Sequence, residues 1–266
     1  MTLGDRMKNA EHEYRRILPS DSYILVRLDG RAFHTYTKGL NQPLDKDLIT
    51  AMNETAKALC EEVQGVRAAY VQSDEISLLI CPWKGDNTPN ATVGELWMGG
   101  VEAKILSLTA SIATARFNQI RAEQGFTKLA HFDSRVWTFD YTQKSEVVEY
   151  FTWRGGDAFK NAITMTALTY FSRKELHKRS TADKIEMLMK VGVHYDDIDR
   201  GFLYGRFLSR QMREEVVEFT RKDTGEASSV VAQRHFWDIQ PFERIVDFWN
   251  EQTLPTHPSL RRGIEK

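Results

Sequence analysis

Acidic residues that could bind a metal ion lie at the ends of two apolar stretches. The stretch "YILVRLDG" at 23–30 ends in Asp29 and Gly30, and "AAYVQSDEISLLI" at 68–80 contains Asp74 in its middle. If the two stretches form neighbouring strands, Asp29 and Asp74 project from one edge of a sheet. Adjacent carboxylates repel each other unless a cation neutralises them, and Mg²⁺ binds a few carboxylates or carbonyls together with phosphate oxygens. This pattern predicts a metal-phosphate site.

A simpler interpretation of the same motifs is that both are turns, because Asp-Gly and Asp-Glu pairs are frequent there. The carboxylates would then be solvated. In the metal-phosphate interpretation, Gly30 allows the backbone to come close to an ion. Arg31, His34 and Lys104 could supply positive charge and hydrogen bonds to a triphosphate. The residues alone leave both interpretations open.

A sheet covered by helices would position these residues. Strands are predicted at 23–30, at 68–83 around the turn Ser73-Asp74-Glu75, and at 135–141. Apolar residues at three- and four-residue steps predict a helix over 48–63, and a longer helix is predicted at about 96–123. The resulting order of strand, helix, hairpin, helix and strand is typical of an α+β sandwich with helices on one face.

The second half of the chain has a different pattern. Helices are predicted at about 144–151, 157–173 and 181–190, the last with a capping box that starts at Ser180 and with Gly192 as its stop. Alternation over 215–237 around Asp223-Thr224-Gly225 predicts a β-hairpin. The stretch 81–95 is rich in Pro, Gly and Asn and is predicted to be an exposed loop.

Composition limits the classes of partner. The 266 residues include 36 basic and 37 acidic side chains, so a nucleic acid must be held by a local patch or by several subunits. Cys60 and Cys81 lack the spacing of a zinc site or a disulfide framework, which favours a reducing cytoplasm. The polar N-terminus and the absence of an apolar run of about 18 residues argue against a signal peptide and a membrane span.

Several motifs resemble the tRNA-His guanylyltransferase superfamily, whose members add nucleotides to the 5′ end of RNA. Its paired signature is similar to "RLDGRAFHTY" at 27–36 together with "YVQSDEISLLI" at 70–80. Further similarity to the bacterial and archaeal type, the guanylyltransferase-like proteins or reverse polymerases, lies at 3–11, 107–118, 131–137 and 153–163.

The resemblance implies a polymerase-palm-like (ferredoxin-like) antiparallel sheet with helices on one face. Residues 1–140 would form the catalytic domain with the nucleotide and metal site. Residues 141–266 would form a helical and hairpin region packed on it, or the whole chain would be one continuous domain.

The resemblance also implies the site residues. Asp29, the Gly30 carbonyl and Asp74 would bind two Mg²⁺ ions, and Glu75 would have a supporting catalytic role. The nucleoside triphosphate would be contacted by Asp29, Gly30, Arg31, Ala32, Phe33, His34, Ser73, Asp74 and Lys104.

The chemistry that the resemblance implies has two steps, transfer of AMP from ATP to the 5′-phosphate of tRNA and attack by the 3′-hydroxyl of an incoming GTP. The eukaryotic members carry His-Ile-Asn-Asn where this chain has Phe159-Lys160-Asn161-Ala162, and a lysine where it has Gln42. We therefore expect template-dependent extension of 5′-truncated tRNAs in preference to dedicated guanylylation of tRNA-His.

RNA contacts and assembly are further expectations. Family members commonly form homotetramers in which one tRNA touches several subunits. Trp153, Trp237 and Trp249 are expected in the core. Each residue that could contact RNA is otherwise an ordinary surface or helix residue: Arg6, Lys8, Arg154, Lys160, Asn161, Arg206, Arg210 and Arg213.

Two other functions fit part of the pattern. A palm-type nucleotidyl cyclase also places one acid after a first strand and another in a hairpin turn, and it would act without RNA. A catalytically inactive RNA-binding module is the other alternative, although Asp29, Gly30, Asp74 and Lys104 occur together.

Overall fold

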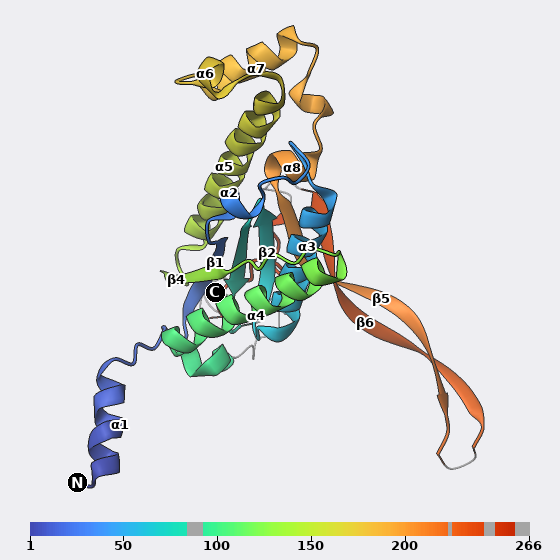
Figure 1. Ribbon diagram of the computed structural model, residues 1–266. Coiled ribbons are helices and arrows are strands. Elements are labelled where there is room, and N and C mark those ends of the chain that lie inside the picture. Colours follow the sequence, from blue (N-terminus) through green and yellow to red (C-terminus); the bar gives the residue numbers. More distant parts are fainter. Residues whose placement is uncertain (84–92, 223–224, 242–247, 259–266) are drawn as a thin grey trace, which may run out of the picture.

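A six-stranded antiparallel sheet forms the centre of the protein (Figure 1). The computed structural model describes residues 1–83, 93–222, 225–241 and 248–258. The strand order is β4-β1-β3-β2-β5-β6, which confirms the α+β prediction. The strands are β1 (Ser22–Gly30), β2 (Val66–Gln72), β3 (Glu75–Ile80), β4 (Phe132–Asp140), β5 (Arg206–Thr220) and β6 (Ala227–Pro241).

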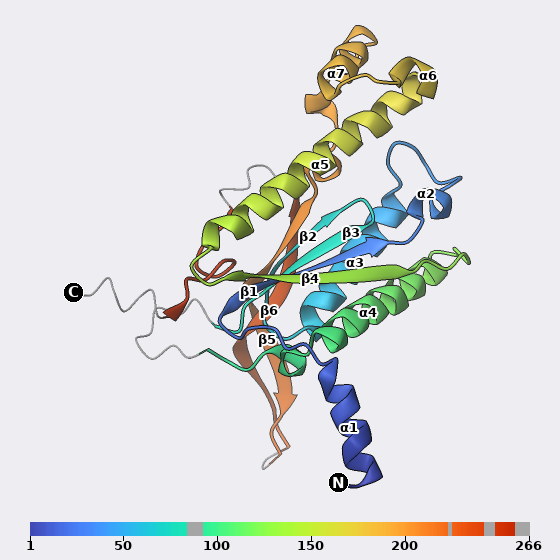
Figure 2. The same cartoon turned by 90° about the vertical axis from the view of Figure 1, so that its left-hand side faces the viewer.

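Helices cover both faces of this sheet. In β1, Ile24 and Val26 belong to one buried core and Tyr23 and Leu25 to another, so each face needs a cover. Helices α3 and α4 lie on the first face and α5 crosses the second (Figure 2). The described helices are α1 (Leu3–Glu13), α2 (Phe33–Tyr36), α3 (Lys46–Glu62), η1 (Trp97–Gly100), α4 (Glu102–Glu123), α5 (Lys144–Tyr170), α6 (Arg173–Leu176), α7 (Thr181–Lys190), η2 (Tyr195–Asp197) and α8 (Arg200–Tyr204).

Helix α3 illustrates how the sequence sets a covering helix. Its N-cap is Asp45, whose carboxylate accepts a hydrogen bond from the Leu48 amide at 2.9 Å. Met52, Ala56 and Leu59 recur on one side and are fully buried against the sheet. The apolar spacing that predicted this helix is therefore the contact with the core.

Helix α5 is a single helix through residues 144–170, where two helices were predicted. The interval between the two predicted helices contains Gly155 and Gly156, each of which costs about 1 kcal/mol relative to alanine inside a helix. Phe151 before the glycines and Ile163 after them are both fully buried. Packing on both sides outweighs the low helix propensity, and the helix continues.

The β5–β6 hairpin extends far beyond the sheet (Figure 1). Only Arg206–Ser209 of β5 pair with β2, whereas β5 and β6 pair with each other along their whole length. The hairpin predicted at 215–237 is confirmed and is longer than expected. Two of its predicted turn residues, Asp223 and Thr224, lie outside the described residues, as do residues 84–92 of the predicted loop.

The two halves of the sequence share one sheet, since β1 to β4 come from residues 1–140 and β5 and β6 from residues 141–266. Helix α1 projects from this body and buries none of its residues (Figure 1). None of the described helices is long and apolar enough to cross a bilayer.

Candidate functional site

Strand pairing brings the two predicted acids to one edge of the sheet. Asp29, at the end of β1, is the direct cross-strand partner of Glu75, the first residue of β3. Asp74 precedes Glu75 in the β2–β3 turn, where Ser73 has a left-handed φ of 46°. The Gly30 amide donates a hydrogen bond to the Asp74 carbonyl at 3.1 Å. The motifs at 29–30 and 73–75 are therefore in contact, although they are distant in sequence.

The electrostatics of Asp74 reflect this crowding of acids. The pKa of Asp74 is raised to about 6, mainly by burial and in smaller part by the negative charges of Asp29 and Glu75. The hydrogen bond from the Ser73 hydroxyl to Oδ1, at 3.0 Å, acts in the opposite direction. A cation between the carboxylates would remove the repulsion.

Glu75 is engaged by a different partner. Its carboxylate accepts hydrogen bonds from Arg154 Nε at 2.8 Å and Nη2 at 2.7 Å, and each of the two side chains is 9% exposed. Burial lowers the pKa of Arg154, but the hydrogen bonds and charge of Glu75, together with Asp157, more than offset this, so that the net shift is upward. The predicted RNA contact of Arg154 is thus corrected, because its guanidinium is buried between α5 and β3. Glu75 positions α5 on the sheet.

Gly30 is required by packing as well as by the expected close approach of backbone to an ion. A Cβ at Gly30 would lie 2.1 Å from the Phe33 ring. Phe33 packs against Phe117 and Phe132, with ring centroids at 5.7 and 5.5 Å. Ala32, with a left-handed φ of 52°, turns the chain between them. The turn after β1 is therefore anchored in the core.

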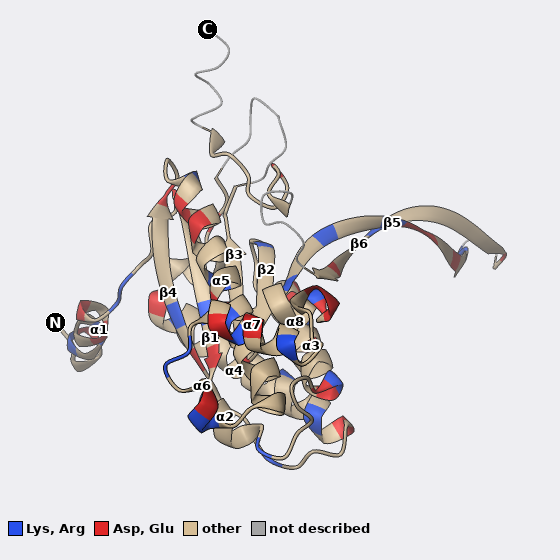
Figure 3. Cartoon of the chain, turned by 90° about the horizontal axis from the view of Figure 1, so that it is seen from above, with Lys and Arg blue, Asp and Glu red and all other residues tan. Residues whose placement is uncertain are grey.

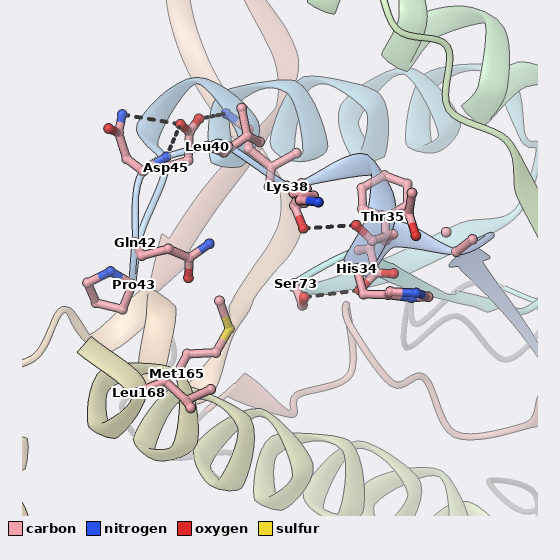
Figure 4. Close-up of a pocket in the computed structure, with 18 of the residues that line it drawn as sticks. His34, Thr35, Lys38, Leu40, Gln42, Pro43, Asp45, Ser73, Met165 and Leu168 are labelled. Atoms are coloured by element: carbon pink, nitrogen blue, oxygen red, sulfur yellow. Dashed lines mark hydrogen bonds between the residues drawn. The ribbon is translucent and has the colours of Figure 1, made fainter. Parts of the chain in front are cut away.

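A cavity of about 1200 Å³ opens beside these turns. The predicted residues Asp29, Gly30, Ala32, Phe33, His34, Ser73 and Asp74 all line it. Met165 and Leu168 of α5 form part of its wall and lie across from the 38–45 segment (Figure 4). The cavity lies where the acidic edge of the sheet meets α5.

Apart from Gln42, the rest of this lining was not predicted from the sequence. Lys38 and Asn41 follow the first motif closely, so a basic and amide-containing loop after the motif was an available signal. Leu168, Phe171 and Arg173 come from α5 and the start of α6, and no local pattern connects them with the acids.

Arg31 and Lys104 are not brought into the cavity. Both side chains are exposed, and neither residue is among those that line it. Lys104 lies near the start of α4, a full turn before Thr109, which hydrogen-bonds Ser134 of β4 at 2.9 Å. The predicted triphosphate contact of Lys104 has no support in this arrangement.

The other basic residues are dispersed over the molecule, and basic and acidic positions are intermixed along the ribbon when it is viewed from above (Figure 3). Arg6 and Lys8 are exposed on α1, Lys160 and Asn161 are exposed on α5, and Arg210 and Arg213 are exposed on β5.

Arg206 differs from these exposed residues and corrects a prediction. It is buried, and it donates to Asn53 Oδ1 at 2.7 Å and to the Gly201 carbonyl at 3.0 Å. Burial lowers its pKa to about 10. Arg206 therefore connects α3, α8 and β5 inside the protein and does not line an RNA path.

The tryptophans also differ from expectation in one case. Trp237 and Trp249 are partly buried against the two cores, as predicted. Trp153 is 54% exposed on α5, so its prediction as a core residue is wrong. Its neighbours Phe151 and Arg154 take the positions that face the sheet.

The residues present fit Mg²⁺ better than a metal held entirely by protein. Among the described residues, no group of three or more His, Cys, Asp or Glu side chains is placed to hold a metal ion. Asp29 and Asp74 supply two carboxylates and Gly30 a carbonyl, which leaves coordination positions for phosphate oxygens and water. Such a mixed set is what Mg²⁺ accepts in nucleotide sites.

Comparison with known proteins agrees with this architecture. The family model described as "tRNAHis guanylyltransferase" matches residues 4–140. The tRNA(His) guanylyltransferase of Debaryomyces hansenii is 25% identical, over 91% of this chain and 94% of that protein. A solved bacterial tRNA(His) guanylyltransferase (Thg1)-like protein in complex with ATP is 32% identical with a TM-score of 0.75, over 95% of this chain and 97% of that one. A structure of the bacterial Thg1-like protein in complex with GTP has a TM-score of 0.72, with 32% identity over 92% of this chain and 94% of that one.

The fold and these relatives together define a nucleotidyltransferase with a central antiparallel sheet. More specifically, the chain belongs to the tRNA-His guanylyltransferase family.

Proposed function

We propose that this protein catalyses template-dependent 3′-to-5′ nucleotide addition to the 5′ end of tRNA, either in repair of 5′-truncated tRNA or in guanylylation of tRNA-His. The observation that carries the proposal is the contact between the Asp29-Gly30 and Ser73-Asp74 turns at the edge of a cavity of about 1200 Å³. This places two carboxylates beside a space that can admit a nucleotide.

Asp29, Asp74 and the Gly30 carbonyl would hold Mg²⁺. When bound, a pair of such ions neutralises charge that develops on in-line phosphoryl oxygens. Asp74 contributes a carboxylate whose pKa is raised by burial and by nearby negative charge. Asp29 contributes a carboxylate that is 42% exposed and accessible from the cavity.

The nucleoside triphosphate would occupy the cavity. Gly30, Ala32, Phe33, His34 and Ser73 would orient the phosphates. Lys38 and Arg173 on the cavity wall add positive charge. Met165 and Leu168 offer apolar surface for a base. ATP and GTP are named as ligands of the bacterial relatives, which supports both nucleotides as substrates here.

The reaction would proceed in two balanced transfers. In the first, an oxygen of the RNA 5′-phosphate attacks the α-phosphorus of ATP, and pyrophosphate leaves. In the second, the 3′-hydroxyl of the incoming nucleotide attacks the activated 5′-phosphorus, its proton goes to solvent, and AMP leaves. Neither transfer needs a covalent protein nucleophile, and the chain's contribution is positioning and charge.

Repair of truncated tRNA is the favoured form of this activity. Gln42 lines the cavity at the position where a lysine is expected in eukaryotic relatives, so one cation is missing from the wall. Phe159-Lys160-Asn161-Ala162 likewise departs from the eukaryotic motif. Pairing with the opposite acceptor strand would then select each added nucleotide.

The protein would act in the cytoplasm as a homotetramer. The exposed part of the β5–β6 hairpin carries Met212, Val216 and Val231 at 60–64% exposure, although an isolated two-stranded hairpin is marginally stable in water. Contact with another copy would cover these side chains. Light scattering after size-exclusion chromatography is expected to give a tetramer, and a monomer at assay concentration would refute the assembly.

Incubation with Mg²⁺, ATP and labelled GTP tests the activity, in parallel with a 5′-truncated tRNA and without RNA. The proposal predicts RNA lengthened at its 5′ end. A cyclic nucleotide formed without RNA would instead establish a cyclase, and tight RNA binding without any product would establish an inactive binding module.

A further inference from the structure

Trp153 has an unusual position in the middle of α5. It is 54% exposed, while its neighbours Phe151 and Arg154 are buried against the sheet. The surrounding exposed positions Thr152, Gly156 and Lys160 are not apolar, so the indole is not part of a larger apolar patch. An isolated exposed indole of this kind suits a flat, partly polar ligand better than the apolar surface of a protein.

The Trp153 ring is held in place by a chain of contacts. The guanidinium carbon of Arg154 lies 4.4 Å from a ring centroid of Trp153. Arg154 is itself fixed by Glu75, at 2.7 and 2.8 Å, and by Asp157, at 2.9 Å. The indole is therefore preorganised, which lowers the entropic cost of stacking on it.

These contacts also connect Trp153 with the acidic edge of the sheet. Glu75 is the cross-strand partner of Asp29, so Arg154 joins the indole to the strand end that carries the first acid. Met165 of the cavity wall lies about three turns further along the same helix.

Positive charge lies on the same face of the sheet. Arg27 of β1 and Arg135 of β4 are direct cross-strand partners, an arrangement that is unfavourable unless the like charges are compensated. Ser77, the partner of Arg27 on β3, hydrogen-bonds Tyr150 of α5 at 2.7 Å, which places this row under α5.

The positive charges of Arg27 and Arg135 are only partly compensated by other groups among the described residues. Among the described residues, the buried Nε of Arg27 has no hydrogen-bond partner. Arg135 is only loosely paired with Asp29 and Asp133, at 3.9 and 3.6 Å. An anion beside the Arg135 guanidinium, whose side chain is 55% exposed, would supply part of the missing compensation.

We propose that Trp153 is a stacking platform for a base at the 5′ end of the RNA, with the adjoining phosphate directed toward Arg27 and Arg135. The inference rests on the proposed function, since it assigns a position to the RNA substrate of that same site. An RNA base is favoured over the base of the triphosphate because Trp153 does not line the cavity, whose own wall supplies Met165 and Leu168.

The test uses a 5′-truncated tRNA with 2-aminopurine as its first nucleotide, because stacking quenches the fluorescence of this base. The wild-type protein is expected to quench it on binding, Trp153→Phe to quench it partly, and Trp153→Leu to bind the RNA about tenfold or more weakly without quenching. Tyr170→Ala is the matched control, because Tyr170 is also 54% exposed on α5 and does not line the cavity. It should behave as the wild type does.

Other outcomes distinguish a failure of the stacking platform from a failure of the proposed nucleotide addition. Wild-type quenching without RNA extension would contradict the proposed function and leave the platform supported. RNA extension and quenching that are unchanged in Trp153→Leu would overturn the platform alone. A loss of GTP affinity in the absence of RNA, or a change in the mass of the assembly, would reassign the indole to the nucleotide or to a second copy. If Trp153→Leu does not fold, the wild type and Trp153→Phe test the proposal instead. If neither protein quenches the 2-aminopurine fluorescence, Trp153 is not a stacking platform.

Discussion

Asp29 and Glu75 are direct cross-strand partners at the end of β1 and the start of β3, yet their side chains have opposite environments. The Asp29 side chain is 42% exposed and lines the cavity, whereas that of Glu75 is 9% exposed and forms a bidentate pair with Arg154. One carboxylate is therefore available to a ligand, and the other attaches α5 to the sheet. This division of roles underlies the predictions that follow.

Replacing either available acid should abolish nucleotide addition and leave the fold intact. Asp29→Asn and Asp74→Asn are each expected to lower the rate by about a thousandfold or more, because loss of electrostatic stabilisation of this kind costs several kcal/mol at a transition state. Single-turnover extension of a 5′-truncated tRNA measures the effect. Asp133→Asn is the control, since Asp133 is the other cross-strand neighbour of Asp29 but does not line the cavity. An active Asp74→Asn enzyme would contradict the metal assignment.

Removing Glu75 should destabilise the protein because it leaves the Arg154 charge buried without its main partner. We expect Glu75→Ala to lower the free energy of unfolding by about 3–5 kcal/mol in urea titrations. Lys57→Ala breaks an ion pair with Glu54 whose side chains are 32% and 39% exposed, and should cost at most about 1 kcal/mol. Equal effects of the two changes would show that the Glu75–Arg154 pair is not a structural connection.

Gly30→Ala tests whether packing fixes the turn after β1. The added methyl group would meet the Phe33 ring at 2.1 Å, so unfolding should become easier by about 1–3 kcal/mol and activity should fall with it. Gly156→Ala, in α5, meets no atom within 4 Å and should raise stability by up to about 1 kcal/mol. Thermal and urea unfolding of the two variants measures this contrast, and a Gly30→Ala protein as stable as the wild type would refute it.

The raised pKa of Asp74 predicts an unusual dependence of stability on pH. The pKa is about 6 in the folded protein against an ordinary 3.8, so the folded state binds this proton more tightly than the unfolded state does. Stability from this group therefore increases as pH falls from about 6 toward 4, and it is lost above about 6.

Urea titrations without Mg²⁺ at pH 5 and pH 7.5 measure this dependence. Asp74→Asn should remove about 1–2 kcal/mol of the difference in unfolding free energy between the two pH values. If the difference in unfolding free energy between the two pH values is the same in the wild type and in Asp74→Asn, the pKa of the Asp74 carboxyl group is not raised in the folded protein.

Much of the central fold follows from local pattern. The apolar runs at 23–30 and 68–80, the face of α3 and the capping box of α7, in which the Ser180 hydroxyl accepts from the Asp183 amide at 3.1 Å, were all predictable because neighbouring residues determine them. The meeting of Asp29 with Asp74 also followed, once the two strands were taken as neighbours.

Features decided by distant contacts were not predictable in this way. In the sequence, Arg154 and Arg206 resemble surface cations. In the fold they are buried, and their guanidinium groups donate hydrogen bonds to Glu75 and Asn53, respectively. The continuity of α5 through Gly155 depends on packing against the sheet, α7 and α8. Leu168 becomes part of the cavity wall because α5 extends that far. No local sequence motif predicts such long-range contacts.

Binding of Mn²⁺, a spectroscopically visible substitute for Mg²⁺, tests the central claim most directly. In the presence of a non-hydrolysable GTP analogue, electron paramagnetic resonance should detect about two bound ions per wild-type chain and a clear loss of binding in Asp29→Asn and Asp74→Asn. Undiminished binding of both ions in the two variants would contradict the proposal that these carboxylates form the metal site.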